Sequence, residues 1–127
     1  MIQTDPVADF ITRDAIPAGD LVGFYAARNA QDNLLICSQT RENAITELTY
    51  SIRLKALSGD AISAFLAETR KTKTAGQVAR RKGLFVCASF PLAELGDPWA
   101  IFVGANSVGG GRVMDETAWQ MIFIKKP

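Results

Sequence analysis

The sequence predicts an α+β fold, in which a curved and mostly antiparallel sheet of about six strands carries two helices on one face, in the order α-β-β-β-α-β-β-β. Three observations support this fold class. Hairpin-length polar turns separate short apolar runs, which favours antiparallel pairing. The stretch 46–57 alternates apolar and polar residues, as a half-buried strand does. Two other stretches repeat apolar residues at the i, i+3, i+4 spacing of an amphipathic helix.

The first helix is expected close to the N-terminus. Asp5 can cap it and Pro6 suits its first turn, after which Val7, Phe10 and Ile11 share one face. The proline and glycine of the next turn signal should then end it.

The second helix is expected over 61–70. Ser58-Gly59-Asp60 ends a strand and can cap a helix, and Ile62, Phe65 and Leu66 then repeat at helical spacing. The following stretch, 72–83, is basic, and the sequence does not decide its structure. It could extend the helix, form a second short helix or be a mobile loop.

Six apolar stretches have the length and composition of strands, and no linker separates them, so residues 1–127 are expected to form one domain. The expected strands are 21–28, 34–38, 46–57, 84–90, 99–104 and 117–124. The alternation in 46–57 is the clearest, with Ile52 on a buried face and Arg53 on a solvated one.

The two cysteines, Cys37 and Cys87, each lie inside an apolar run, and we expect two small buried side chains with reduced thiols. No apolar run approaches the ~20 residues that span a bilayer. The first residues also lack the basic and apolar regions of a signal peptide. We therefore expect a cytoplasmic protein without a membrane partner. A disulfide could form if the two strands were neighbours, but the reducing cytosol disfavours it.

The absence of histidine excludes several chemistries. Ser-His-Asp and Cys-His catalysis are impossible within this chain, and two distant cysteines without histidine make no zinc site. We expect no metal and no cofactor. Gly104 and Gly109 have the spacing of a phosphate-binding loop, but Gly110 and Gly111 stand where lysine and serine or threonine are needed. Gly109, Gly110, Gly111 and Arg112 are kept as a possible site within a hairpin loop.

Charge is unevenly distributed along a chain whose net charge is only +1. The stretch 69–93 contains six cations and no carboxylate. These candidate binding residues are Arg70, Lys71, Lys73, Arg80, Arg81 and Lys82. Such a stretch is either plain solvated surface or a site for an anionic partner.

The first functional hypothesis is a small non-catalytic interaction module that adapts or inhibits another protein, with an acidic partner favoured, through the basic segment 70–82. The alternative is a nucleic-acid-binding accessory protein that uses the same segment. No aromatic residue lies between Ala67 and Leu84 to stack on bases, and the pI of about 7.8 is low for such a protein. A second alternative is an enzyme with a histidine-free acid or tyrosine site.

Overall fold

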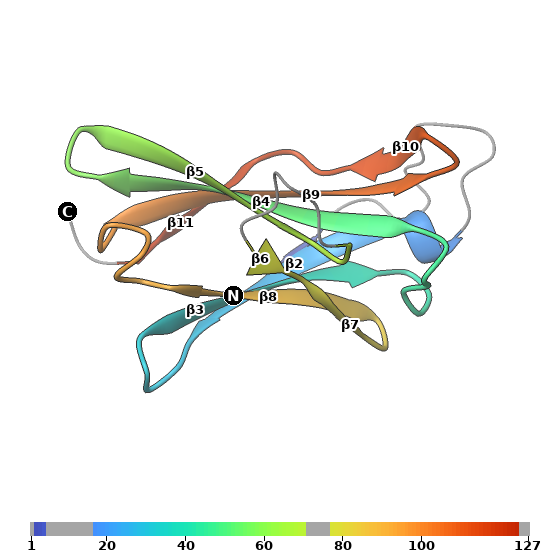
Figure 1. Ribbon diagram of the computed structural model, residues 1–127, viewed down its shortest axis with the longest axis horizontal. Coiled ribbons are helices and arrows are strands. Elements are labelled where there is room, and N and C mark those ends of the chain that lie inside the picture. The colour runs from blue at the N-terminus through green and yellow to red at the C-terminus, as the bar shows by residue number, and fades with distance from the viewer. Residues whose placement is uncertain (1, 5–16, 71–76, 125–127) are drawn as a thin grey trace.

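Two sheets packed face to face form a β-sandwich in the computed structural model (Figure 1). The structure describes residues 2–4, 17–70 and 77–124. The predicted α+β class is therefore wrong, because a second sheet, and not a layer of helices, covers the apolar face of the first. The sheet expected to be continuous is divided in two.

Sheet A contains five strands in the order β1-β2-β3-β8-β7, and every neighbouring pair is antiparallel. Its strands are β1 (Ile2–Thr4), β2 (Leu21–Arg28), β3 (Asn33–Thr40), β8 (Phe85–Pro91) and β7 (Arg80–Lys82). Sheet B has the order β10-β9-β4-β5-β6, and β11 pairs with β9 beside β10. Its strands are β10 (Arg112–Glu116), β9 (Ala100–Gly109), β4 (Thr49–Ser58), β5 (Ala61–Glu68), β6 (Gln77–Val78) and β11 (Gln120–Phe123).

The helix predicted over 61–70 is strand β5. Gly59 has a positive φ of 59° and opens a two-residue turn between Ser58 and Ala61, as in a type II′ hairpin. The three apolar residues at helical spacing were too few to distinguish the two periods, and Ile62, one of them, is 66% exposed. Pairing along the whole length of β4 decides the outcome.

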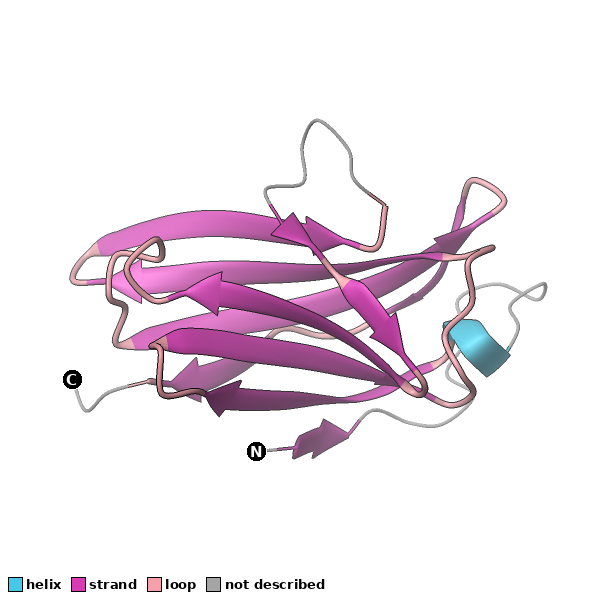
Figure 2. Ribbon diagram, turned by 60° about the horizontal axis from the view of Figure 1, so that its bottom comes forward, coloured by secondary structure: helices cyan, strands magenta, loops and turns pink. Residues whose placement is uncertain are grey.

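The helix predicted after Asp5 lies outside the described residues. Within the described ranges, the helical structure is a single 3-10 turn, Pro17–Gly19 (Figure 2). No helix in this part of the chain has the length and apolar character needed to cross a membrane.

All six predicted strands are present: β2 has the predicted ends, and the ends of the other five are shifted. The stretch 99–104 continues as β9 to Gly109, and a tight hairpin joins it to β10, a strand that the sequence did not predict. β9 is a central strand, since β4 lies on one side of it and β10 and β11 on the other.

The stretch left open at 72–83 contains a strand that changes sheets. β6 pairs in parallel with β5 of sheet B, and β7 pairs antiparallel with β8 of sheet A. Ala79, buried between them, donates its N–H to Glu68 O at 2.8 Å. This crossing joins the two sheets along one side of the sandwich.

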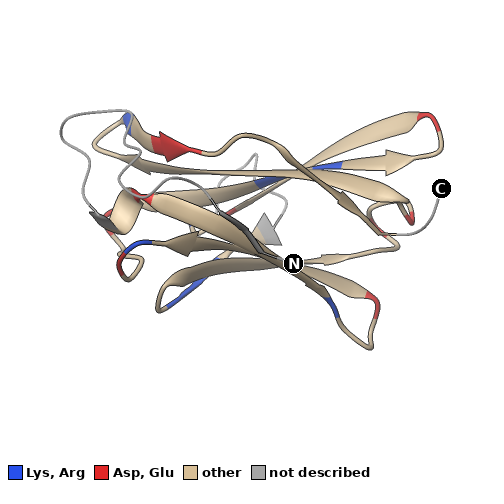
Figure 3. Cartoon of the chain, turned by 180° about the vertical axis from the view of Figure 1, so that it is seen from behind, with Lys and Arg blue, Asp and Glu red and all other residues tan. Residues whose placement is uncertain are grey.

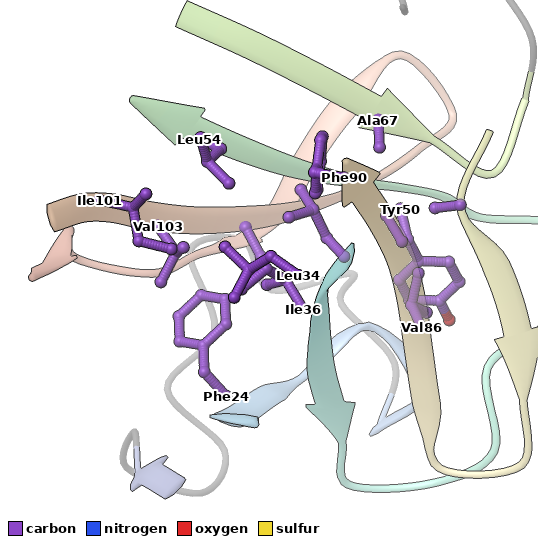
Figure 4. Packing of buried hydrophobic residues seen from close by; sticks show 14 of the residues in the cluster. Phe24, Leu34, Ile36, Tyr50, Leu54, Ala67, Val86, Phe90, Ile101 and Val103 are labelled. Atoms are coloured by element: carbon purple, nitrogen blue, oxygen red, sulfur yellow. The ribbon is translucent and has the colours of Figure 1, made fainter. Parts of the chain in front are cut away.

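The core lies between the inner faces of the two sheets, where side chains from β2, β3 and β8 point toward those of β4 and β9 (Figure 4). The predicted alternation of β4 is confirmed: Ile52 and Leu54 are fully buried, whereas Arg53 and Lys55 are exposed. Tyr50 closes one end of the core, donating its hydroxyl to Ala18 O at 2.6 Å and accepting from Ile45 N at 3.2 Å.

The two cysteines form a disulfide, so the expectation of reduced thiols is wrong. Cys37 on β3 and Cys87 on β8 stand directly opposite one another in the antiparallel register. Opposite residues in such a ladder share a face and bring their Cβ atoms close together. This juxtaposition was not visible in a sequence where the two positions lie 50 residues apart.

Candidate functional site: an arginine-lined hollow

The predicted basic segment is divided by the fold. Lys71 and Lys73 lie outside the described residues. Arg70 follows the end of β5 in sheet B, whereas Arg80, Arg81 and Lys82 make up β7 in sheet A. Viewed from behind, the described lysines and arginines lie at separate places along the chain, in both sheets (Figure 3). The four described cations of the segment therefore do not form one continuous basic surface.

Because successive side chains of a strand leave on opposite faces, the three cations of β7 do not share one face either. Arg81 pairs with Val86, which is fully buried, so its side chain leaves on the core side of sheet A. Arg80 and Lys82 pair with Cys87 and Phe85, on the outer face. At the edge of the sandwich, the Arg81 Nη1 donates to the main-chain oxygen of Ala44 at 3.5 Å, in the connection between β3 and β4.

Arg81 meets Arg70 at a surface hollow of about 380 Å³. The hollow lies beside the start of β4 and the end of β5. Its lining residues are Thr46, Glu47, Leu48, Thr49, Thr69, Arg70 and Arg81. Two cations eleven positions apart in the sequence thus share one small concavity, because β5 and the β6–β7 crossing bring them there from different sheets.

The hollow is polar and carries a positive charge excess. Glu47 is the only carboxylate among its lining residues, against two guanidinium groups. The described residues provide no ion-pair partner within 4.0 Å for either arginine. The Thr69 hydroxyl oxygen is already engaged, since it accepts from Tyr50 N at 3.0 Å. Thr46 is exposed at the rim.

Two arginine forks and nearby hydroxyl groups are suited to binding a carboxylate or a phosphate. Arg81 keeps its guanidinium accessible because β7 is an edge strand, and Arg70 is exposed. The lining residues include neither a nucleophilic cysteine nor a histidine, so the arrangement can hold an anion but offers no acid–base pair beyond Glu47.

The possible loop site does not join this hollow. Gly110 and Gly111 have φ values of 59° and 76° and form the two-residue turn between β9 and β10. Two positive φ values are those of a type I′ hairpin turn, which explains the glycines without a phosphate. Gly109 packs so tightly that an added Cβ would lie 2.4 Å from a methyl group of Leu48.

The buried acids Asp115 and Asp20 and the buried Tyr50 make contacts within the protein that stabilise the fold. Asp115 is fully buried and accepts hydrogen bonds from Leu21 N at 2.7 Å and Glu116 N at 2.8 Å. Asp20, also fully buried, lies 3.6 Å from Arg41 Nε. Burial raises the pKa of Tyr50 above its ordinary value, and the nearby charge of Arg81 partly opposes this rise. Among the described residues, no group of three or more cysteine or carboxylate side chains is placed to hold a metal ion.

A second hollow, which the sequence did not indicate, lies on the outer face of sheet B. Its volume is about 450 Å³. It is lined by Arg53, Leu54, Lys55, Ala64, Phe65, Leu66 and Trp119. Lys55 Nζ lies 4.8 Å from the centre of the Trp119 ring, a cation–π contact. These residues come from β4, β5 and the segment between β10 and β11, so no local motif could have identified them.

No protein-family model matches this chain, and no match is found among curated proteins or among solved structures. Its function therefore has to be inferred from the chemistry of the two hollows.

Proposed function

We propose that this protein is a non-catalytic interaction domain that binds an acidic segment of another protein at the hollow between Arg70 and Arg81, and so adapts or inhibits that partner. The observation that carries the proposal is the convergence of these two arginines from different sheets. Mutually repelling cations lower the stability of a fold, so their placement at one concavity favours an anionic ligand.

A protein partner is favoured over nucleic acid because of the other two described cations of the segment, Arg80 and Lys82. A nucleic-acid surface needs several basic groups in one stripe to contact successive phosphates. Here Arg80 and Lys82 face away from Arg81 on the outer side of sheet A. The hollow also lacks an aromatic lining residue on which a base could stack. A single carboxylate-bearing segment fits this geometry better than a polyanionic strand.

The test compares two double variants that carry the same change in charge. Arg70→Glu with Arg81→Glu reverses the hollow, whereas Arg80→Glu with Lys82→Glu reverses two exposed cations outside it. Binding of a fluorescent decaglutamate peptide is measured by anisotropy at low and high salt. We expect the first variant to weaken binding at least ~10-fold and the second to weaken it by less than ~3-fold, since only the first touches the site.

Two results would contradict this proposal. Equal losses in the two variants would mean that overall charge, and not the hollow, attracts the peptide. Tighter binding of a single-stranded oligonucleotide, with log affinity falling steeply against log salt, would replace the protein partner with nucleic acid. Melting temperatures of both variants should stay close to that of the parent protein, because all four side chains are exposed.

For the cellular compartment we propose an oxidising one, in place of the cytoplasm expected from the sequence. The support is the Cys37–Cys87 disulfide, since such bonds persist mainly outside the reducing cytosol. Alkylation of protein taken directly from its source cells, with and without prior reduction, tests this. Labelling of both cysteines without reductant would contradict this proposal and support the cytoplasmic location expected from the sequence.

A further inference from the structure

The strands at the edges of the two sheets are not equally protected against pairing with another strand. β7 consists of three cations, and β10 contains three charged residues and a bulge between Val113 and Asp115. β1 and β11 are only three and four residues long. Charge, bulges and shortness are the usual ways in which proteins block sheet edges.

The edge formed by β5 has none of these protections over 61–66. This stretch reads Ala-Ile-Ser-Ala-Phe-Leu, without charge, proline or an irregularity in its register with β4. β5 lies along the outer margin of sheet B (Figure 1), and β6 pairs only with Ala67 and Glu68. Within the described part of the chain, no strand pairs with 61–66 on the side away from β4.

The register shows which backbone groups face this open side. Ser58 and Ala61 close the two-residue turn and form a hydrogen-bonded pair. Hydrogen-bonded and non-hydrogen-bonded pairs alternate along an antiparallel ladder. The N–H and C=O groups of Ile62, Ala64 and Leu66 therefore point away from β4. An added antiparallel strand could form about six backbone hydrogen bonds with these three residues.

The second hollow lies next to this edge and indicates which side chain an added strand would carry. Ala64 pairs with Lys55 on the outer face, and its small side chain leaves the hollow open between the edge and Lys55. Lys55 contacts Trp119 but has no carboxylate within 4.0 Å among the described residues. Leu66 and Trp119 supply apolar walls.

We propose that the free edge of β5 binds an extended segment of a partner protein as an additional antiparallel strand, with a carboxylate side chain opposite Ala64 reaching across to Lys55. In an antiparallel pair, directly opposite residues share a face, so that side chain enters the hollow. Backbone pairing supplies affinity and the hollow supplies specificity, as in other cases of strand addition. This site is separate from the Arg70–Arg81 hollow.

A second copy of this chain fits the edge less well than a peptide does. Pairing two β5 strands about a two-fold axis at Ala64 would place residue 61 of one copy opposite Ala67 of the other. β6 already occupies that place, since Gln77 pairs with Ala67. The turn at Gly59 and Asp60 would meet the same obstacle. A peptide can end or bend away before reaching β6.

The probe is a blocked five-residue peptide in which alternating valine and threonine flank a central glutamate, so that it spans 62–66 and ends before β6. It is compared with versions carrying central glutamine or lysine. Backbone amide shifts and hydrogen exchange of the protein are followed by NMR during titration. We expect slower exchange at Ile62, Ala64 and Leu66, with no change at Val113 on the protected β10 edge. The glutamate peptide should bind ~3- to 10-fold more tightly than the glutamine peptide, and Lys55→Gln should abolish that preference.

Ala64→Pro is the decisive variant. The Ala64 N–H points away from β4, so proline removes no native hydrogen bond and is tolerated on a sheet edge. It should weaken the peptide at least ~10-fold while the Arg70→Glu, Arg81→Glu variant leaves peptide binding unchanged. If Ala64→Pro does not fold, Ile62→Lys blocks the same edge with a charge, and Val113→Lys on β10 is its matched control.

Several outcomes would overturn the proposal. These are unchanged exchange at the three amides at millimolar peptide, equal affinity of the Ala64→Pro variant, and a preference for the lysine peptide. Concentration-dependent dimerisation lost on Ile62→Lys would assign the edge to a second copy instead. Because the probe does not depend on the arginine hollow, a failure here leaves the proposed function standing, and the reverse also holds.

Discussion

Tyr50→Phe should destabilise the protein by about 2 kcal/mol at neutral pH. The Tyr50 side chain is fully buried, and its hydroxyl is the shared partner of Ala18 O, at 2.6 Å, and Ile45 N, at 3.2 Å. Phenylalanine keeps the ring packing but leaves the carbonyl of buried Ala18 without this donor. An unsatisfied buried polar group costs ~1–3 kcal/mol. Ile45 is only partly buried, so water can replace the bond at its N–H and limit the loss.

The difference between the parent protein and Tyr50→Phe should also depend on pH. Desolvation by burial raises the pKa of Tyr50 above its ordinary value of 10.0. The folded state therefore holds the phenolic proton more tightly than the unfolded state does. Stability from this group is fully present below the ordinary pKa and is lost as pH rises through the raised folded-state pKa. The two proteins should thus approach one another in stability above about pH 10.

Urea unfolding at about pH 8 and about pH 11 measures both effects, and the difference between the proteins cancels the titration of the lysines. Tyr25→Phe is the control, because Tyr25 is 40% exposed on the outer face of sheet A. It should cost less than ~0.5 kcal/mol. If the two substitutions cost the same at neutral pH, or if the Tyr50→Phe difference grew in alkali, the hydroxyl would not have the role assigned to it.

Two further predictions concern the faces of β4 and the disulfide. Ile52→Asp places a charge in the core and should cost several kcal/mol, whereas Arg53→Asp, at a half-exposed side chain 3.4 Å from Glu116, should cost under ~1 kcal/mol. Similar melting temperatures for this pair would show that the faces are reversed. Replacing Cys37 and Cys87 together by serine opens a cross-link between residues 50 positions apart and should cost about 4 kcal/mol in calorimetry or urea unfolding. Unchanged stability, or labelling of the parent protein without reductant, would contradict a formed disulfide.

The strands could be predicted because their signal is local. In β4, successive side chains face the core and the solvent in turn, and the apolar and polar residues Ile52, Arg53 and Leu54 alternate in the same way. The hairpin of β2 and β3 was predictable for the same reason, since polar turn residues separate two apolar runs. Neither observation says whether the apolar face is covered by helices or by a second sheet, because both provide the same apolar partner.

The predicted helix at 61–70 failed because its pattern was short and its context was non-local. Ile62, Phe65 and Leu66 match the helical period, but β5 gains a full antiparallel pairing with β4 through the turn at Gly59. Pairing with a formed neighbour outweighs the propensity of a few residues. Gly59, which the sequence analysis placed in a helix cap, lies in the turn of the β4–β5 hairpin.

For the candidate site, the sequence identified the cations but not their grouping. Arg70 and Arg81 belong together, and Arg80 and Lys82 do not join them, because β7 alternates at an edge and the chain changes sheets at Ala79. The hollow beside Ala64 was missed altogether, since it depends on one small side chain next to Lys55 and on Trp119 from the segment between β10 and β11.

By itself, the sequence determined the position of the main strands, the buried face of β4, the absence of histidine chemistry and the presence of a basic segment. These features depend on residues close together in the chain, so the spacing and composition of the sequence reveal them. Only the tertiary structure decided that two sheets form the fold, that Cys37 meets Cys87, which arginines share a hollow and which edge stays open. Each of these depends on pairing between strands that lie far apart in the chain, and such pairing is selected by the packing of the whole sandwich.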